Sequence, residues 1–122
     1  MKLVDSSCWV HCLRSRGDRQ IVTRVRSLVT SGEAAWCAMV RLELWAGAGS
    51  ENDRRVLREF EQTMPELPIS EEVWEEACEL ADRCRRAGKT APAHDVLIAA
   101  CARHHGVELE HADSHFEFLM KL

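Results

Sequence analysis

The sequence predicts an α/β fold: a three-layer α/β/α sandwich whose mainly parallel sheet has four or five strands. Short apolar segments that fit strands alternate along the chain with segments whose apolar residues recur every three or four positions, as in amphipathic helices. The 122 residues are 46% hydrophobic and 30% charged. This composition is typical of globular proteins, and the length fits one domain over residues 1–122.

The first half of the chain is expected to contain two strands and four helices. The strands are residues 2–5 and 34–39, and the helices are residues 6–13, 18–30, 40–48 and 51–64. The hydroxyls of Ser6 and Ser7 are suited to cap the first helix. Gly32 is placed to end the second helix, because glycine readily adopts the left-handed conformation found after helix C-termini.

The second half is expected to contain two further strands and two long helices. The strands are residues 67–69, bracketed by Pro65 and Pro68, and residues 107–109. The helices run from Ser70 to Gly88 and from Pro92 to about residue 105, and a short apolar segment at residues 116–119 follows. Residues 96–102 are apolar on every side, so this helix should lie at the centre of the fold.

The charge balance argues against nucleic-acid binding by bulk charge. Sixteen basic and twenty acidic side chains give a net charge of −4, so binding to phosphates would need a local basic patch or a metal ion. Two basic clusters exist, and the second is better explained as a solvated helix end. They are Arg14, Arg16 and Arg19, and Arg83, Arg85, Arg86 and Lys89.

Membrane insertion and secretion are not expected. No apolar run approaches the roughly 20 residues that span a bilayer, and Asp5 interrupts the apolar stretch that a signal peptide needs. A cytoplasmic location is therefore predicted. The six cysteines fall mostly inside apolar patterns, so reduced and buried thiols are expected rather than disulfides.

Four acids are expected at the carboxyl edge of the sheet, where ligands of open parallel sheets bind. Asp5 ends the first strand and Glu43 follows the second. Asp95 lies in the first turn of the apolar helix, and Asp113 follows the fourth strand. Clustered carboxylates repel one another unless a divalent cation neutralises them, and Mg²⁺ and Mn²⁺ prefer carboxylate oxygens. A metal held there can activate a water that hydrolyses a phosphodiester.

The four acids also have a simpler interpretation, in which they do not form a common site. Twenty acids in 122 residues allow four to be chosen by chance, Asp95 can serve only the dipole of its helix, and Glu43 can be a solvated helix residue.

Four segments in order surround these acids, namely residues 3–10, 41–48, 93–100 and 109–116. The first is an apolar strand followed by Asp5 and two serines, and the second places Glu43 in a short helix before small residues. The third has Asp95 opening an alanine-rich helix, and the fourth ends around Asp113. In this order and spacing the chain resembles the PIN-domain ribonucleases, and most closely the VapC-type toxins of bacterial toxin–antitoxin pairs.

The resemblance implies a PIN-like fold and a metal-dependent endoribonuclease that acts as the toxin of a toxin–antitoxin pair. It implies that Asp5, Glu43, Asp95 and Asp113 hold Mg²⁺ or Mn²⁺ as catalytic residues, with assistance from Ser7. It further implies an RNA substrate, a cognate antitoxin protein and a homodimer. Two departures are that His111 stands where many relatives have Thr or Ser, and that little chain follows Asp113 to form a last edge strand.

Other functions are also consistent with parts of the sequence. A PIN-type nuclease of RNA processing would carry the same acids, and a non-catalytic PIN fold could serve as a binding module. A receiver-like regulatory domain also binds Mg²⁺ at strand ends, but it needs paired acids where this chain has Ser6 and Ser7. Zinc binding through pairs such as Cys8 with His11 lacks a Cys-x-x-Cys motif. The four tryptophans are expected in the core or an interface, with Trp45 the one candidate for contact with a base.

Overall fold

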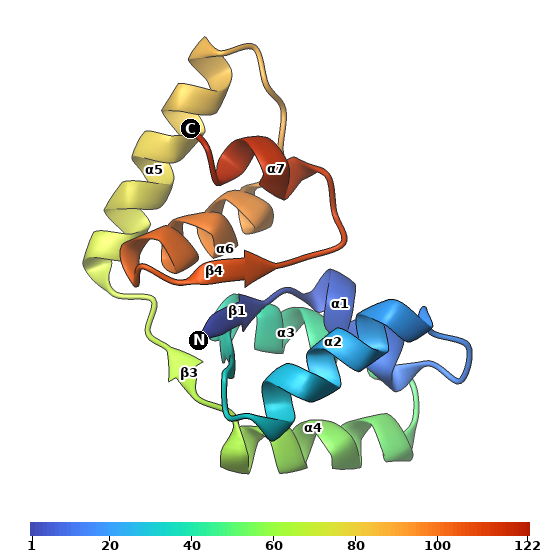
Figure 1. The fold of residues 1–122 in the computed structure, drawn as a ribbon. Coiled ribbons are helices and arrows are strands. Elements are labelled where there is room, and N and C mark those ends of the chain that lie inside the picture. The colour runs from blue at the N-terminus through green and yellow to red at the C-terminus, as the bar shows by residue number, and fades with distance from the viewer.

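A computed structural model describes residues 1–122, which form four strands and seven helices (Figure 1). The strands are β1 (Lys2–Val4), β2 (Ala34–Cys37), β3 (Glu66–Leu67) and β4 (Glu108–Glu110). The helices are α1 (Ser6–Leu13), α2 (Arg19–Thr30), α3 (Ala38–Ala46), α4 (Glu51–Thr63), α5 (Glu71–Arg86), α6 (Ala93–His104) and α7 (His115–Leu119).

The four strands form one parallel sheet in the order β3-β2-β1-β4. Leu3 in β1 pairs with Ala35 in β2 on one side and with Leu109 in β4 on the other. The chain therefore proceeds outward from β1 to β2 and β3, and then crosses to the opposite side of β1 for β4. A crevice forms beyond the carboxyl ends of strands where the order reverses in this way, and ligands of such sheets bind there.

Helices cover both faces of the sheet, as the sequence predicts (Figure 1). Helices α5, α6 and α7 lie on one side of β1 and β4, and α2 and α4 lie on the other, whereas α3 lies behind β1 and contacts α1 and α6. One core of 25 buried hydrophobic residues connects the layers, with Trp9 and Trp36 as its largest side chains. Helix α6 is buried from Asp95 through Ala102, which confirms its predicted central place. None of the helices combines the length and apolar character needed to span a bilayer.

The start of α1 differs from the prediction in a way that matters for the site. Asp5, rather than either serine, caps the helix, because its Oδ2 accepts a hydrogen bond of 3.0 Å from the amide of Ser7. Asp5 therefore stands just after β1 and not within it. The indole Nε1 of Trp9 donates to the carbonyl of Val4 at 2.8 Å, so the turn between strand and helix is fixed from both sides.

Several predicted boundaries were wrong by one to two residues. Strand β2 ends at Cys37, two residues early, because helix α3 begins at Ala38. Strand β3 covers Glu66–Leu67 and β4 covers Glu108–Glu110, so both include acids that a search for apolar segments passes over. Pro92 precedes α6 as its N-cap rather than lying in its first turn. No fifth strand is present in residues 1–122, and the sheet therefore has four strands.

Two details concern the core. Trp74 is half exposed on α5, so of the two places expected for the tryptophans, core or interface, it does not lie in the core. All six cysteines are free, as expected, but Cys78 is exposed rather than buried.

Candidate metal centre

The site begins with Asp5, which is only 3% exposed although it carries a carboxylate. Its backbone amide donates to the carbonyl of Glu110 at 2.9 Å, which ties the end of β1 to the end of β4. One carboxylate oxygen, Oδ2, caps α1, whereas the other, Oδ1, is buried without a hydrogen-bond partner. A buried carboxylate oxygen without a partner is costly, so this atom requires an explanation.

Glu43 and Asp95 bring two further carboxylates to the same place. Glu43 comes from α3, the helix that follows β2, and its Oε1 is buried without a partner. Asp95 comes from the first turn of α6 and is only 4% exposed, and its Oδ2 likewise accepts no hydrogen bond. Three elements that are distant in sequence thus each contribute one unsatisfied carboxylate oxygen to the carboxyl edge of the sheet.

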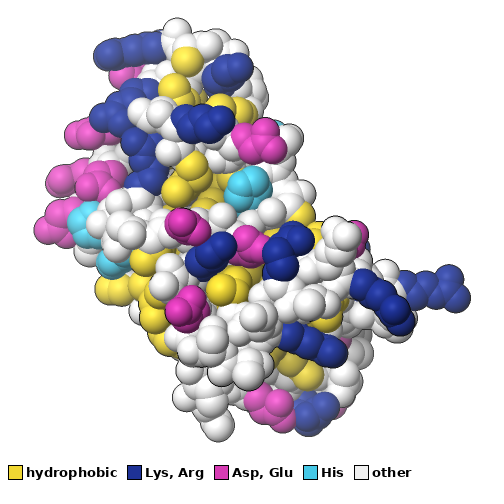
Figure 2. All heavy atoms as spheres, in the orientation of Figure 1, with side chains coloured by type: hydrophobic (Ala, Val, Ile, Leu, Met, Phe, Trp, Pro, Cys, Tyr) yellow, Lys and Arg dark blue, Asp and Glu magenta, His cyan; other side chains and the backbone are white.

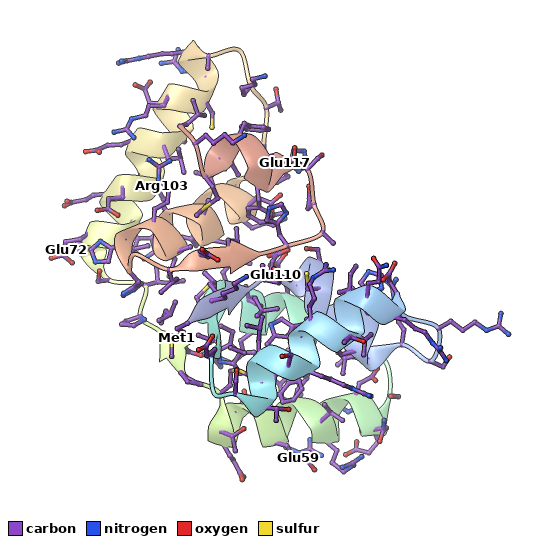
Figure 3. The ribbon with its side chains drawn as sticks, viewed as in Figure 1. Met1, Glu59, Glu72, Arg103, Glu110 and Glu117 are labelled. Atoms are coloured by element: carbon purple, nitrogen blue, oxygen red, sulfur yellow. The ribbon has the colours of Figure 1, made fainter.

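Asp113 reaches the site from the loop after β4. Ser7 holds this loop, because its Oγ accepts a hydrogen bond of 3.0 Å from the amide of Ala112. The structure therefore shows the Ser7 hydroxyl engaged with the backbone of the loop, next to Asp113. Glu110, labelled in Figure 3, also ends β4, but it forms an ion pair with Arg24 at 2.7 Å. Glu110 is thus paired with arginine, whereas Asp5, Glu43 and Asp95 each keep an oxygen without a hydrogen-bond partner.

Two histidines that the sequence analysis did not place in the site lie between the acids. Nε2 of His94 is 3.3 Å from Oδ1 of Asp95 and 3.6 Å from Oε2 of Glu43. Nδ1 of His115 is 2.9 Å from Oδ1 of Asp113 and 3.3 Å from Oδ2 of Asp95. Their positions in the sequence gave a usable signal, since His94 precedes Asp95 and His115 follows Asp113 by two residues.

The acids of the site influence one another's pKa values. Burial raises the pKa of Asp95 above its ordinary value; His94 and His115 oppose this shift, whereas Asp113 and Asp5 add to it. Burial also raises the pKa of Glu43, with Asp5 and Asp95 acting in the same direction. Asp5 and Asp95 therefore act electrostatically on Glu43, and Asp5 and Asp113 act on Asp95. Such an arrangement favours a bound cation, which would remove the repulsion between the carboxylates.

A divalent ion fits this set of donors. One ligand atom each from Asp95, Asp113 and His115 lies within 4.8 Å of the other two. Asp5 and Glu43 lie outside this group of three, but each has an unsatisfied oxygen of the type that Mg²⁺ and Mn²⁺ prefer. The buried carboxylates without partners, rather than the number of acids, are the feature that points to an ion.

Other predicted participants lie elsewhere. His111 packs against Phe116 with the two rings tilted and their centroids 5.3 Å apart, and it is not part of the acid cluster. Trp45 donates its indole N–H to Oε2 of Glu61 at 3.1 Å, so its polar end is engaged with α4. Burial raises the pKa of Cys8 to about 12, so this thiol is not an active nucleophile. The cluster of possible metal ligands contains no cysteine, which gives no support to a zinc site.

Comparison with known proteins explains this geometry. The PIN domain family profile matches residues 2–119. The VapC ribonuclease Mb1587 of Mycobacterium bovis is 31% identical over 126 residues, which cover 100% of this chain and 93% of that protein. The chain belongs to the PIN domain family, among the VapC ribonucleases.

Solved structures of PIN domains confirm the fold. The structure of FitAB bound to the IR36 DNA fragment matches with a TM-score of 0.82 and 21% identity, over 100% of this chain and 92% of that chain. VapC20 of Mycobacterium tuberculosis, described as a toxin that cleaves the sarcin-ricin loop, matches with a TM-score of 0.76 and 17% identity, over 97% and 94% of the two chains. At these identities the likeness concerns the fold of the PIN domain alone.

Proposed function

We propose that this PIN domain is a metal-dependent endoribonuclease, and that it acts as the toxin of a toxin–antitoxin pair. The observation that carries the proposal is the set of buried, unpartnered carboxylate oxygens on Asp5, Glu43 and Asp95. They lie at the carboxyl edge of the sheet in a chain that belongs among the VapC ribonucleases. Relatives that carry this name provide the class of substrate, and the site provides the chemistry.

The residues of the chain have separate tasks in the proposed reaction. Asp5, Glu43, Asp95 and Asp113 would hold Mg²⁺ or Mn²⁺, and His115 is near enough to Asp95 and Asp113 to act as a nitrogen ligand. The bound ion supplies an activated water and stabilises negative charge on the phosphodiester. Asp5 also caps α1 through Oδ2, so its free Oδ1 is held in a fixed direction. Ser7 positions the loop of Asp113 through the amide of Ala112.

The test is cleavage of a mixed RNA pool by the purified protein with Mg²⁺ or Mn²⁺. Parallel reactions contain EDTA, or an Asp95→Asn variant prepared identically. We expect cutting in the wild-type reaction and none in either control. Equal cutting by the variant would contradict the proposal, because it would assign the activity to another site or to a contaminating nuclease.

We propose an antitoxin protein as the partner of this chain. Its main contact is an apolar groove between α1, α2 and α4. The groove has a volume of about 250 Å³, and its lining includes Trp9, Val25, Val29 and Phe60. Val29 is one of the few large hydrophobic side chains left exposed. A Val29→Glu substitution should weaken inhibition of RNA cleavage by the protein encoded beside this chain. Undiminished inhibition would place the antitoxin elsewhere.

We further propose that residues 1–122 act as one domain that forms a homodimer in the cytoplasm. Leu42 on α3 is 60% exposed and is a suitable contact between two copies. Light scattering during size-exclusion chromatography should give about twice the mass of the 13.9 kDa chain. A mass of one chain would contradict the dimer.

A further inference from the structure

The arginines of this protein divide into two groups. Nine of them bind an acidic side chain or a backbone carbonyl, as in the pair between Arg41 and Glu66 at 2.8 Å or the bond from Arg103 to the carbonyl of Leu119 at 2.8 Å. Four make neither an ion pair nor a side-chain hydrogen bond. These four are Arg14, Arg16, Arg19 and Arg26, and all are exposed at the turn between α1 and α2 or in α2 itself.

Three of the four unpaired arginines line one hollow, which we call the arginine hollow. It lies between the end of α1 and the first two turns of α2 and has a volume of about 470 Å³. Its lining includes Arg14, Arg19, Arg26, His11, Ser15 and Thr23, and it contains no acid. Figure 2 shows dark-blue side chains that project from the side of the molecule where Figure 1 draws the α1–α2 loop. The hollow therefore gathers positive charge in a protein whose net charge is −4.

The backbone of the hollow is preorganised. A Cβ at Gly17 would come within 2.0 Å of the carbonyl oxygen of His11, so the turn requires glycine here. Nδ1 of His11 accepts a hydrogen bond of 3.0 Å from the amide of Asp18. Asp18 in turn caps α2 through the amides of Gln20 and Ile21. A ligand in the hollow would therefore pay little for ordering the turn that presents the arginines.

The hollow lies on the side of the molecule that carries the acids. Asp5 and Arg14 stand at opposite ends of α1, which has eight residues and is about 12 Å long at 1.5 Å per residue. In Figure 1 the α1–α2 loop lies on the side toward which the arrows of β1 and β4 point, and this is the carboxyl edge of the sheet. A stacked strand rises about 3.4 Å per nucleotide, so the hollow is about four nucleotides from the metal centre.

We propose that the arginine hollow binds backbone phosphates of the RNA substrate a few nucleotides away from the bond that is cut. This inference rests on the proposed ribonuclease function. Guanidinium groups bind phosphate oxygens in a bidentate manner, and arginines that make no ion pair are free to do so. The hydroxyls of Ser15 and Thr23 add donors for the same oxygens. Because phosphate contacts position an RNA without reading its bases, the hollow sets affinity and register and leaves base choice to other contacts.

The test compares two pairs of arginines that carry the same charge. An Arg14→Gln/Arg19→Gln variant removes two unpaired arginines from the hollow, and an Arg55→Gln/Arg58→Gln variant removes two arginines that are paired with Glu59 and Glu51 on α4. All proteins carry Asp95→Asn, so that RNA stays intact. Binding of a fluorescent single-stranded RNA is measured by anisotropy at several salt concentrations, with circular dichroism to confirm folding. Arg26 is left unchanged because it also lines the apolar groove.

We expect the hollow variant to bind RNA at least about tenfold more weakly than the parent at low salt. The slope of log affinity against log salt should fall by about 1.4, or 0.7 for each lost phosphate contact. The α4 variant should differ from the parent by less than about twofold. Equal weakening in both variants would contradict the proposal, since it would show an effect of net charge only.

Three other outcomes distinguish this proposal from the ribonuclease function itself and from binding of an acidic polypeptide. If the hollow variant binds RNA like the parent while the protein without Asp95→Asn cuts RNA, the hollow proposal fails and the ribonuclease function stands. If the hollow variant instead loses binding to poly-L-glutamate but not to RNA, the hollow belongs to an acidic polypeptide, and the RNA proposal is overturned. If wild-type protein neither binds nor cuts RNA, the proposed function fails together with the hollow proposal.

Discussion

Two groups of acids in this PIN domain have opposite environments. On the outer surface of α4 and α5, Glu51 is bonded to Arg54 and Arg58, and Asp82 is bonded to Arg85 and Arg86. These arginines hold the pKa of both carboxyls below the ordinary values. At the carboxyl edge, burial raises the pKa of Glu43 and Asp95.

The surface acids stabilise the fold through ion pairs, whereas the edge acids are the ones that we propose bind a ligand. The surface acids have cations within 3.2 Å and water around them, so they require nothing further. The edge acids have buried oxygens without partners, and the folded protein bears that cost. A domain that stores such strain at one place is expected to recover it when an ion binds there.

The largest expected effect comes from a matched pair of substitutions, each of which removes one negative charge. Glu43→Gln should lower the rate of RNA cleavage at least about 100-fold, because it removes a charge next to the ion. Glu51→Gln removes the same charge from an exposed, paired position and should change the rate by less than about twofold. Initial rates with Mn²⁺ measure both. A similar loss in the two variants would show that the acids act through net charge and not through a site.

The second difference concerns stability against pH without metal. The folded-state pKa of Glu43 and of Asp95 is raised, so the folded protein keeps protons that the unfolded chain has released. Stability should therefore fall as the pH rises from the ordinary values of 4.5 and 3.8 through the raised ones.

A Glu43→Gln/Asp95→Asn variant should abolish this dependence. In EDTA at pH 7 we expect it to be more stable than the wild-type protein by about 1 to 3 kcal/mol, with the difference vanishing below pH 3.8. An Asp82→Asn variant should show the opposite sign, since its pKa is lowered and its ionised form stabilises the fold. Urea denaturation at a series of pH values measures both, and parallel curves for all three proteins would contradict the account.

The smallest expected effect separates the two histidines of the site. His115→Ala removes a nitrogen that lies with Asp95 and Asp113 in the ligand cluster, whereas His94→Ala removes one that lies outside it. Imidazole is a better ligand for Mn²⁺ than for Mg²⁺, so His115→Ala should weaken Mn²⁺ binding about tenfold and Mg²⁺ binding less. His94→Ala serves as the control. Equal weakening for both ions would reduce His115 to a group that positions Asp113.

The fold could be predicted from the sequence where local patterns and burial agree. Residues 96–102 are apolar on every side, and α6 is indeed central. The bounds of strand β3 were predicted wrongly, because its pairing with β2 and not its own composition determines which residues form the strand. Glu66 pairs in register with Trp36, and its carboxylate binds Arg41, a contact between residues 25 positions apart. Trp74 was expected in the core or an interface, and the structure leaves it half exposed on α5, so the sequence alone did not decide between the two.

The site could be predicted only in part, because contacts between distant parts of the chain do not appear in local sequence patterns. The four acids follow strands or open a helix, and parallel strands bring such positions to one edge. The place of His115 two residues after Asp113 was a usable signal, but its contact with Asp95 depends on the loop that Ser7 holds through Ala112, which the sequence does not show. The arginine hollow could not be predicted, because nine of the thirteen arginines bind an acid or a carbonyl and only the structure shows which four do not.

The most direct test of the account is a calorimetric titration of Mn²⁺ into three folded proteins: wild type, Asp95→Asn and Asp82→Asn. Unpaired edge acids should bind the ion and paired surface acids should not. We expect saturable binding in the wild type and in Asp82→Asn, and none in Asp95→Asn at the same concentrations. Equal binding by all three proteins, or no binding by any of them, would contradict the claim that the unpartnered carboxylates form a metal centre.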